Sequence, residues 1–150
     1  DLRLAGDMAT NNIALNATLS TLYTAMESGG KAKPSKKTQL SRATATNLAL
    51  MMTKYSARTT STVSQMYAGG DVDKEVTIDS LAEEFGAQIT ELVTLAESNE
   101  VASKLLDSAN TKWDFIKKSY VNYNENRVNF IVNLYSKKII NDIEEALAVM

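Results

Sequence analysis

The sequence contains no cysteine and no histidine among its 150 residues. The lack of cysteine excludes disulfide bonds, thiolate catalysis and thiolate metal sites. The lack of histidine removes the commonest metal ligand and the side chain best suited to proton transfer near neutral pH, so Ser-His-Asp and Cys-His mechanisms are excluded. Nothing positive in the sequence indicates catalysis, and we predict that the protein is not an enzyme.

Other shortages narrow the possible partners. The net charge is −2 and the isoelectric point is near 5.2, whereas a nucleic-acid-binding protein normally has a basic face. No apolar run approaches the ~18 residues that a membrane-spanning helix needs. We therefore predict no nucleic-acid partner, and membrane contact only through segments outside this chain. Because residue 1 is Asp and not Met, we expect that a leader, an anchor or a longer N-terminal region has been removed.

The scarcity of helix-breaking residues points to long helices. There is one Pro and there are six Gly, while hydrophobic residues make up 44% of the chain. Apolar residues recur at spacings of three and four, and no segment alternates apolar and polar residues as a strand does. The sequence predicts one all-α domain over residues 1–150, an up-and-down antiparallel bundle of four to five helices. The helices are expected near 2–28, 36–68, 78–97, 100–121 and 126–149.

Each helix carries an apolar stripe that we expect to face the core. In the first helix the stripe consists of Leu4, Met8, Leu15, Leu19, Leu22 and Met26. In the second it includes Leu40, Leu48, Met51, Tyr55, Val63 and Met66, and in the third Ile78, Leu81, Phe85, Ile89, Leu92 and Leu95. The last two helices carry Val101, Leu105, Ala109, Trp113 and Ile116, and then Val128, Ile131, Tyr135, Ile139, Ile143, Leu147 and Met150.

Polar residues with capping potential stand at the expected helix starts. Ser35 follows Pro34 and can cap the second helix, and Ser80 with Glu83 has the spacing of a capping box. Ser98 or Asn99 can cap a helix that starts at about residue 100. The spacing leaves open whether the breaks at 98–100 and 122–126 are kinks or chain reversals.

No metal or cofactor site is predicted. The stretch DVDKEVTIDSLA at 71–82 begins like a Ca²⁺ loop, but Val76 stands where the sharp-turn Gly belongs and Ala82 where the bidentate Glu belongs. Adjacent Glu pairs at 83–84 and 144–145 lack the His partners that a di-iron bundle requires. A solvated acidic loop and a charged helix surface explain these residues without a ligand.

Two arginines near aromatic residues are the candidates for binding a small anion. Arg58 lies in YSARTTST beside Tyr55, and Arg127 lies in NENRVNF near Tyr123. A guanidinium beside Thr and Tyr inside a bundle can hold an anion through forked hydrogen bonds. Trp113 opens the stretch 112–138, which holds most of the aromatic residues. The alternatives are solvent-facing arginines, and an aromatic joint between two helices in place of a ligand cleft.

The C-terminal part of the chain resembles PilJ-type helical domains, the sensing modules of type IV pili methyl-accepting chemotaxis transducers. The resemblance is carried by Trp113, Tyr120, Asn122-Tyr123-Asn124-Glu125, Val128, Phe130-Ile131-Val132-Asn133, Tyr135-Ser136 and Ile139-Ile140. It implies a periplasmic or otherwise exported bacterial protein, similar to nitrate- and nitrite-sensing bundles. The family's first helix carries an arginine-rich motif, but residues 5–15 here are AGDMATNNIAL, so nitrate binding is not implied.

Two functional hypotheses follow. The first is an extracytoplasmic sensor or binding module for a small molecule or a partner protein. If it is a receptor ectodomain, both chain ends should lie at the same end of the bundle. The second is a structural protein that assembles, for example as a homodimer, through an exposed helix face. The Ala-, Ser- and Thr-rich second helix, with TKYSARTTSTVSQ at 53–65, motivates the second hypothesis.

Overall fold

The computed structural model of the chain is all-α and describes residues 2–30, 33–60, 76–122 and 128–150. The side chains of residues 2–10, 12, 13, 16 and 57–60 are not described. Within the described ranges there are five helices and no strand, so the predicted fold class is confirmed. The helices are α1 (Leu2–Gly29), α2 (Lys36–Thr60), α4 (Ile78–Ala96), α5 (Glu100–Val121) and α6 (Asn129–Val149).

Side-chain caps fix the starts of three helices. The Ser35 hydroxyl accepts a hydrogen bond from the backbone N–H of Thr38 at the start of α2 (3.1 Å). The N-cap of α4 is Thr77, whose hydroxyl accepts a hydrogen bond from the backbone N–H of Ser80 (3.1 Å). The expected capping box of Ser80 with Glu83 is therefore wrong, because the helix begins about one turn earlier. Asn99 caps α5. These contacts satisfy backbone donors that a helix start leaves free.

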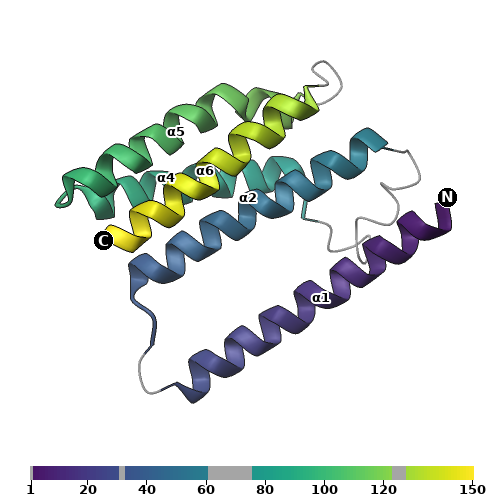
Figure 1. Ribbon diagram of the computed structural model, residues 1–150, viewed down its shortest axis with the longest axis horizontal. Helices are drawn as coiled ribbons and strands as arrows, with labels where there is room; N and C mark the ends of the chain where they lie inside the picture. The colour runs from purple at the N-terminus through teal and green to yellow at the C-terminus, as the bar shows by residue number, and fades with distance from the viewer. Residues whose placement is uncertain (1, 31–32, 61–75, 123–127) are drawn as a thin grey trace.

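Four of the helices form a closed ring. The helix pairs that pack closely are α2 with α4, α4 with α5, α5 with α6, and α6 with α2. Successive helices run in opposite directions, which gives an up-down-up-down bundle (Figure 1). The breaks after α4 and after α5 are therefore chain reversals and not kinks. Every helix of the ring has a neighbour on both sides, so the bundle core is complete without a fifth helix.

The core of the bundle is built from buried side chains of α2, α4, α5 and α6. Leu48, Met51 and Tyr55 of α2 are fully buried, as are Phe85 and Ile89 of α4. Burying an aliphatic or aromatic side chain of this size contributes roughly 1.5–3 kcal/mol. Tertiary packing is therefore sufficient to hold α2, whose Thr-rich sequence has little helix preference of its own.

The stripes expected for the start of α5 and of α6 are wrong by one residue. Val101 and Ile131 are exposed, while Ala102 and Val132, one position further along, are buried. Both helices carry apolar residues on two adjacent sides, so periodicity alone cannot select the buried side. Close packing against the neighbouring helices favours the smaller residues there.

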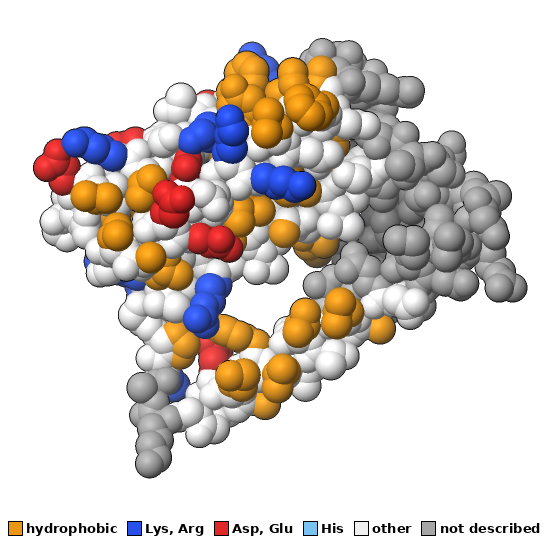
Figure 2. Space-filling model, in the orientation of Figure 1, with side chains coloured by type: hydrophobic (Ala, Val, Ile, Leu, Met, Phe, Trp, Pro, Cys, Tyr) orange, Lys and Arg blue, Asp and Glu red, His pale blue; other side chains and the backbone are white. Residues whose placement is uncertain are grey.

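Helix α1 lies apart from this bundle, and its predicted role in the core is wrong. Leu15, Leu19, Leu22 and Met26, called the α1 stripe below, are exposed at 57%, 52%, 53% and 65%. Figure 1 shows α1 beside α2, and Figure 2 shows an opening between α1 and the bundle. The physical reason is that α2, α4, α5 and α6 already enclose the core, which leaves no position for a fifth helix.

Among the described side chains, Tyr23 and Arg42 connect α1 to the bundle. Nη1 of Arg42 on α2 donates a hydrogen bond to the Tyr23 hydroxyl (3.4 Å). The Arg42 guanidinium also lies 5.7 Å from the centroid of the Tyr23 ring. An exposed cation–π contact of this kind stabilises by about 0.5–1 kcal/mol. This contact orients α1 but buries little of its apolar surface.

The number of helices also decides where the chain ends lie. Helix α1 begins at one end of the molecule and α6 ends at the opposite one (Figure 1). This arrangement is not the one expected above for a receptor ectodomain, which requires both ends on one side. Among the described residues no helix combines the length and the apolar character needed to cross a membrane.

Candidate functional site

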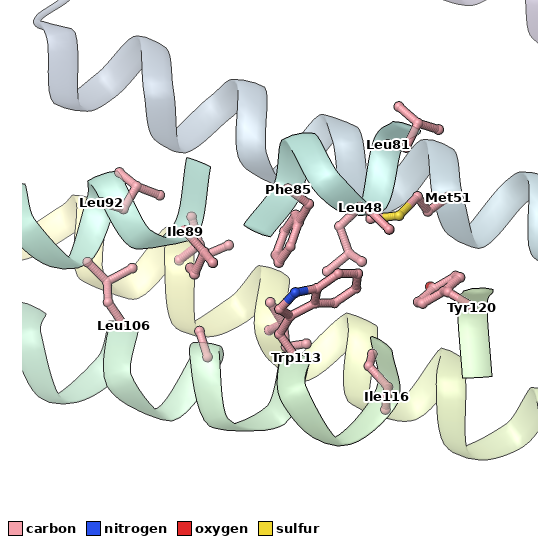
Figure 3. Packing of buried hydrophobic residues seen from close by; sticks show 14 of the residues in the cluster. Leu48, Met51, Leu81, Phe85, Ile89, Leu92, Leu106, Trp113, Ile116 and Tyr120 are labelled. Atoms are coloured by element: carbon pink, nitrogen blue, oxygen red, sulfur yellow. The ribbon is translucent and has the colours of Figure 1, made fainter. Parts of the chain in front are cut away.

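The aromatic residues of the stretch 112–138 separate into a buried group and an exposed group. The buried group is centred on Trp113, which is 2% exposed and points from α5 toward Phe85 of α4 and Leu48 of α2 (Figure 3). The ring centroids of Trp113 and Phe85 are 4.6 Å apart. Aromatic rings in such tilted arrangements stabilise by about 0.5–1.5 kcal/mol beyond the burial of their area.

A polar contact lies inside this buried group. The Tyr120 hydroxyl and the Ser136 hydroxyl are 2.8 Å apart and form a buried hydrogen bond between α5 and α6. The Tyr55 ring packs edge-on against the Tyr120 ring, with centroids 5.3 Å apart. Burial is the largest influence on the Tyr120 hydroxyl and raises its pKa well above the ordinary value. Tyr120 is therefore a neutral structural hydroxyl at physiological pH.

Only part of the predicted ligand site falls on described side chains. Tyr55 and Trp113 come from two helices into the same buried cluster, joined through Tyr120. Arg58 is in the last turn of α2, but its side chain is not described, and Tyr123 and Arg127 lie outside the described residues. The described chain on either side of them, at Thr60, Asn122 and Val128, is at one end of the bundle (Figure 1). Their predicted role in ligand binding stays a prediction.

The exposed group forms an apolar surface across α5 and α6. It consists of Phe115, Phe130, Ile131 and Leu134, called the α5–α6 patch below, which are exposed at 61%, 77%, 38% and 38%. The ring of Phe115 packs against half-buried Tyr135 of α6, with centroids 5.0 Å apart. Figure 2 shows hydrophobic side chains gathered beside basic ones over this part of the bundle. Contiguous exposed apolar side chains of this size mark interaction surfaces more often than isolated ones do.

Basic side chains surround the patch. Lys118 is three residues after Phe115, and Lys137 is three residues after Leu134, so each lies next to a patch residue on its helix surface. Nζ of Lys138 lies 5.6 Å from the centroid of the Tyr135 ring. Asp114 is the one acidic residue within a turn of Phe115, and none lies between Asn129 and Lys138. The patch is therefore apolar at its centre and positively charged at its edge.

A salt bridge limits the patch on one side. Nζ of Lys112 on α5 contacts the carboxylate of Asp142 on α6, and both side chains are mostly buried. Nζ of Lys112 also contacts the Ser108 hydroxyl (2.6 Å). This pair links α5 to α6 one turn from Phe115.

Sequence reasoning missed this patch because Ile131 and Tyr135 were assigned to the core. The signal that could have found it is Phe130, which fits neither the predicted stripe nor the observed one. An aromatic residue outside every stripe predicts an exposed ring, and its Lys neighbours predict a charged edge. The α5–α6 patch therefore lies within the aromatic-rich stretch 112–138.

No metal centre is formed by the described residues, since no three acidic side chains converge in them. Most of the Ca²⁺-like stretch lies outside the described ranges. Glu83, Glu84, Glu144 and Glu145 are exposed.

Comparison with known proteins adds no relative. No family model, no curated protein and no solved structure matches the chain. The resemblance to PilJ-type domains is therefore a prediction from the sequence, and the argument for function rests on the surfaces described above.

Proposed function

We propose that the chain is a non-enzymatic helical-bundle binding module, which recognises an acidic partner protein through the α5–α6 patch. The resemblance to PilJ-type domains supports an extracytoplasmic sensor protein of a bacterium as the setting of this module. The observation that supports the proposal is the exposed group of Phe115, Phe130, Ile131 and Leu134 with lysines at its edge.

The chemistry of the patch defines the partner. Exposed aromatic and aliphatic side chains gain free energy when a partner covers them, and aromatic residues are enriched among those that dominate binding. The surrounding lysines attract a partner with acidic side chains around its own apolar centre, and accelerate its association at low salt. An amphipathic helix with an acidic polar face has both features and can lay its apolar face on the α5–α6 patch.

A synthetic peptide with these features tests the proposal. A fluorescent, Leu-rich and Glu-rich amphipathic peptide should bind the full chain, and binding should weaken as salt increases. Phe130→Ser and Lys138→Glu should each weaken binding at least tenfold, because they remove the apolar centre and the positive edge. The matched control is Lys104→Glu, an exposed lysine elsewhere on α5 that pairs with Glu100. Equal binding by all variants would contradict the proposal.

A second candidate function is the binding of a small ligand at the end of the bundle where α2 ends and α6 begins (Figure 1). It is supported by the convergence of Tyr55 and Trp113 on the Tyr120–Ser136 hydrogen bond near that end. Thermal-shift screening against small anions, amino acids and carboxylates tests it, since a ligand that binds only the folded state raises the melting temperature. A full panel without stabilisation would argue against this function.

A further inference from the structure

The α1 stripe has the spacing of a two-stranded coiled coil. Leu15 and Leu22 are seven residues apart, and so are Leu19 and Met26, while consecutive members are separated by four, three and four. This is the heptad pattern in which positions a and d form the seam between two helices. With Leu15 and Leu22 at d, Leu19 and Met26 are at a. All four side chains are more than half exposed.

The same frame extends toward the N-terminus. Counting back by seven places Met8 at d and Asn12 at a. A single Asn at an a position specifies register and favours two strands, because it pairs best with the same residue of a parallel partner. The frame therefore describes a seam over residues 8–26 with one polar position.

The absence of charge along this seam bears on the identity of the partner. No Asp, Glu, Lys or Arg occurs between Met8 and Met26, and the flanking positions are Asn16, Thr18, Tyr23 and Ala25. In coiled coils the charges at these flanking positions select between different partners. Here the flanking side chains of α1 are uncharged, so a second copy of the same helix brings no charge of its own against them; the Arg42 guanidinium of α2 lies 5.7 Å from the ring centroid of Tyr23 at one flank. A partner with charged flanks would lose hydration without gaining an ion pair.

Helix α1 needs such a partner for its own stability. It is rich in Thr, Asn and Ser, which are poor helix formers, and most helical stability in proteins comes from tertiary packing. The hydroxyls of Thr18, Thr21 and Thr24 already donate to carbonyls one turn earlier in the same helix. Within the described ranges these hydroxyls form no hydrogen bond to another helix. The four-helix ring leaves no position for the α1 stripe.

The area available matches a reversible dimer. Each apolar seam residue can bury roughly 60–120 Å² on pairing, as the transfer free energy of such side chains implies. Five apolar positions then bury roughly 300–600 Å² per partner, which is less than the ~800 Å² per partner of a standard stable interface. Association is therefore expected to be reversible.

We propose that α1 pairs in parallel and in register with α1 of a second copy, forming a homodimer through a coiled coil over residues 8–26. The bundle borders the seam where Arg42 of α2 contacts Tyr23, and the α5–α6 patch is left free. This proposal does not rest on the proposed binding function, because the two surfaces are on different helices.

Sedimentation of the full chain between about 1 and 200 μM tests the association. A reversible monomer–dimer equilibrium is expected. Leu19→Glu should weaken dimerisation at least tenfold, because it introduces two facing charges in the seam. The matched control is Thr21→Glu, at an exposed position off the seam, which should leave the dimer intact. Phe130→Ser should also leave it intact, which separates this proposal from the patch on α5 and α6.

Disulfide formation tests the orientation, since the natural chain has no cysteine. Leu22→Cys should form an intermolecular disulfide under mild oxidation, because identical d positions face each other only in a parallel pair. Thr21→Cys should not. A strictly monomeric protein at the highest concentration, or a dimer that persists in Leu19→Glu, would overturn the proposal. A dimer without the Leu22→Cys disulfide would overturn the parallel register.

Discussion

Helices α1 and α4 carry similar stripes and have opposite environments. Leu19 and Leu22 on α1 are about half exposed, whereas Ile89 and Leu92 on α4 are fully buried. The residue types and their spacing do not explain this difference. Helix α4 packs between α2 and α5, whereas no described helix packs as closely against α1. A stripe thus shows that a helix is able to pack, but the surrounding topology decides whether it does.

The largest expected effect is in the bundle. Trp113→Ala should destabilise the protein by about 3–5 kcal/mol, because it removes the largest buried side chain and leaves a cavity. Urea unfolding followed by circular dichroism at 222 nm measures the change. A loss below about 1 kcal/mol would show that the bundle core is not the stable part of the molecule.

The hydrogen bond inside the bundle gives a smaller effect. Tyr120→Phe should cost about 1–3 kcal/mol, because it leaves the buried Ser136 hydroxyl without its partner. The double variant Tyr120→Phe/Ser136→Ala should recover part of this loss, since neither polar group then remains. Urea unfolding of the two single variants and the double variant gives the interaction energy. Strict additivity would contradict a direct contact.

The pH dependence follows from the raised pKa of Tyr120, which burial keeps protonated. The unfolded chain loses this proton near the ordinary pKa of about 10, while the folded chain retains it. The stabilising contribution is therefore complete below pH ~10 and declines above it, by up to about 1.4 kcal/mol per pH unit. Urea unfolding at pH 9 to 11 should show a shallower decline in Tyr120→Phe than in the natural sequence. Parallel curves would be evidence against a buried neutral hydroxyl.

The cap of α5 gives the next effect. Oδ1 of Asn99 accepts from the backbone N–H groups of Val101 and Ala102, and its Nδ2 donates to the Val149 carbonyl. Asn99→Ala should destabilise the bundle by about 1–2 kcal/mol, because it removes the cap and the contact with α6. Thermal unfolding measures the change, and Asn99→Asp serves as the control that retains the capping oxygen. If both variants lose the same amount, the cap is not the cause.

The smallest expected effect is in α1. Leu22→Ala should change the free energy of unfolding by less than about 0.5 kcal/mol when measured at a protein concentration below the dimerisation range. The corresponding change in the bundle, Leu48→Ala, should cost about 2–5 kcal/mol. Urea unfolding of both variants under the same conditions makes the comparison direct. Equal losses would show that α1 packs into the core in solution.

The parts of the fold that could be predicted from the sequence are those with one unambiguous stripe. On α4, apolar residues from Ile78 to Leu92 occur on one side only, so the buried side follows from spacing. On α6, Ile131 and Val132 are both apolar, and the choice depends on how closely α5 approaches. On α1 the sequence identifies the apolar stripe but does not show what packs against it. The buried side of α6 and the environment of the α1 stripe both depend on how helices far apart in the sequence pack together.

The candidate site was predictable only in part. The sequence directed attention to residues 112–138, and that stretch contains both the buried cluster and the exposed patch. It did not separate Trp113, which is buried, from Phe115 two positions later, which is exposed. Positions two residues apart on an α-helix point in directions that differ by about 200°. When one of them faces the core, the other therefore faces away from it. Which side of α5 faces the core is decided by its packing against the neighbouring helices.

The contact between α6 and α2 has a consequence for chain connectivity. Because these two helices run antiparallel and side by side, the start of α2 and the end of α6 lie at the same end of the ring. A short linker from Met150 to Lys36 would therefore connect them, and the chain could be opened at Ser98 between α4 and α5. Circular permutation should preserve the bundle, since any of its four helices can be the first one in the sequence.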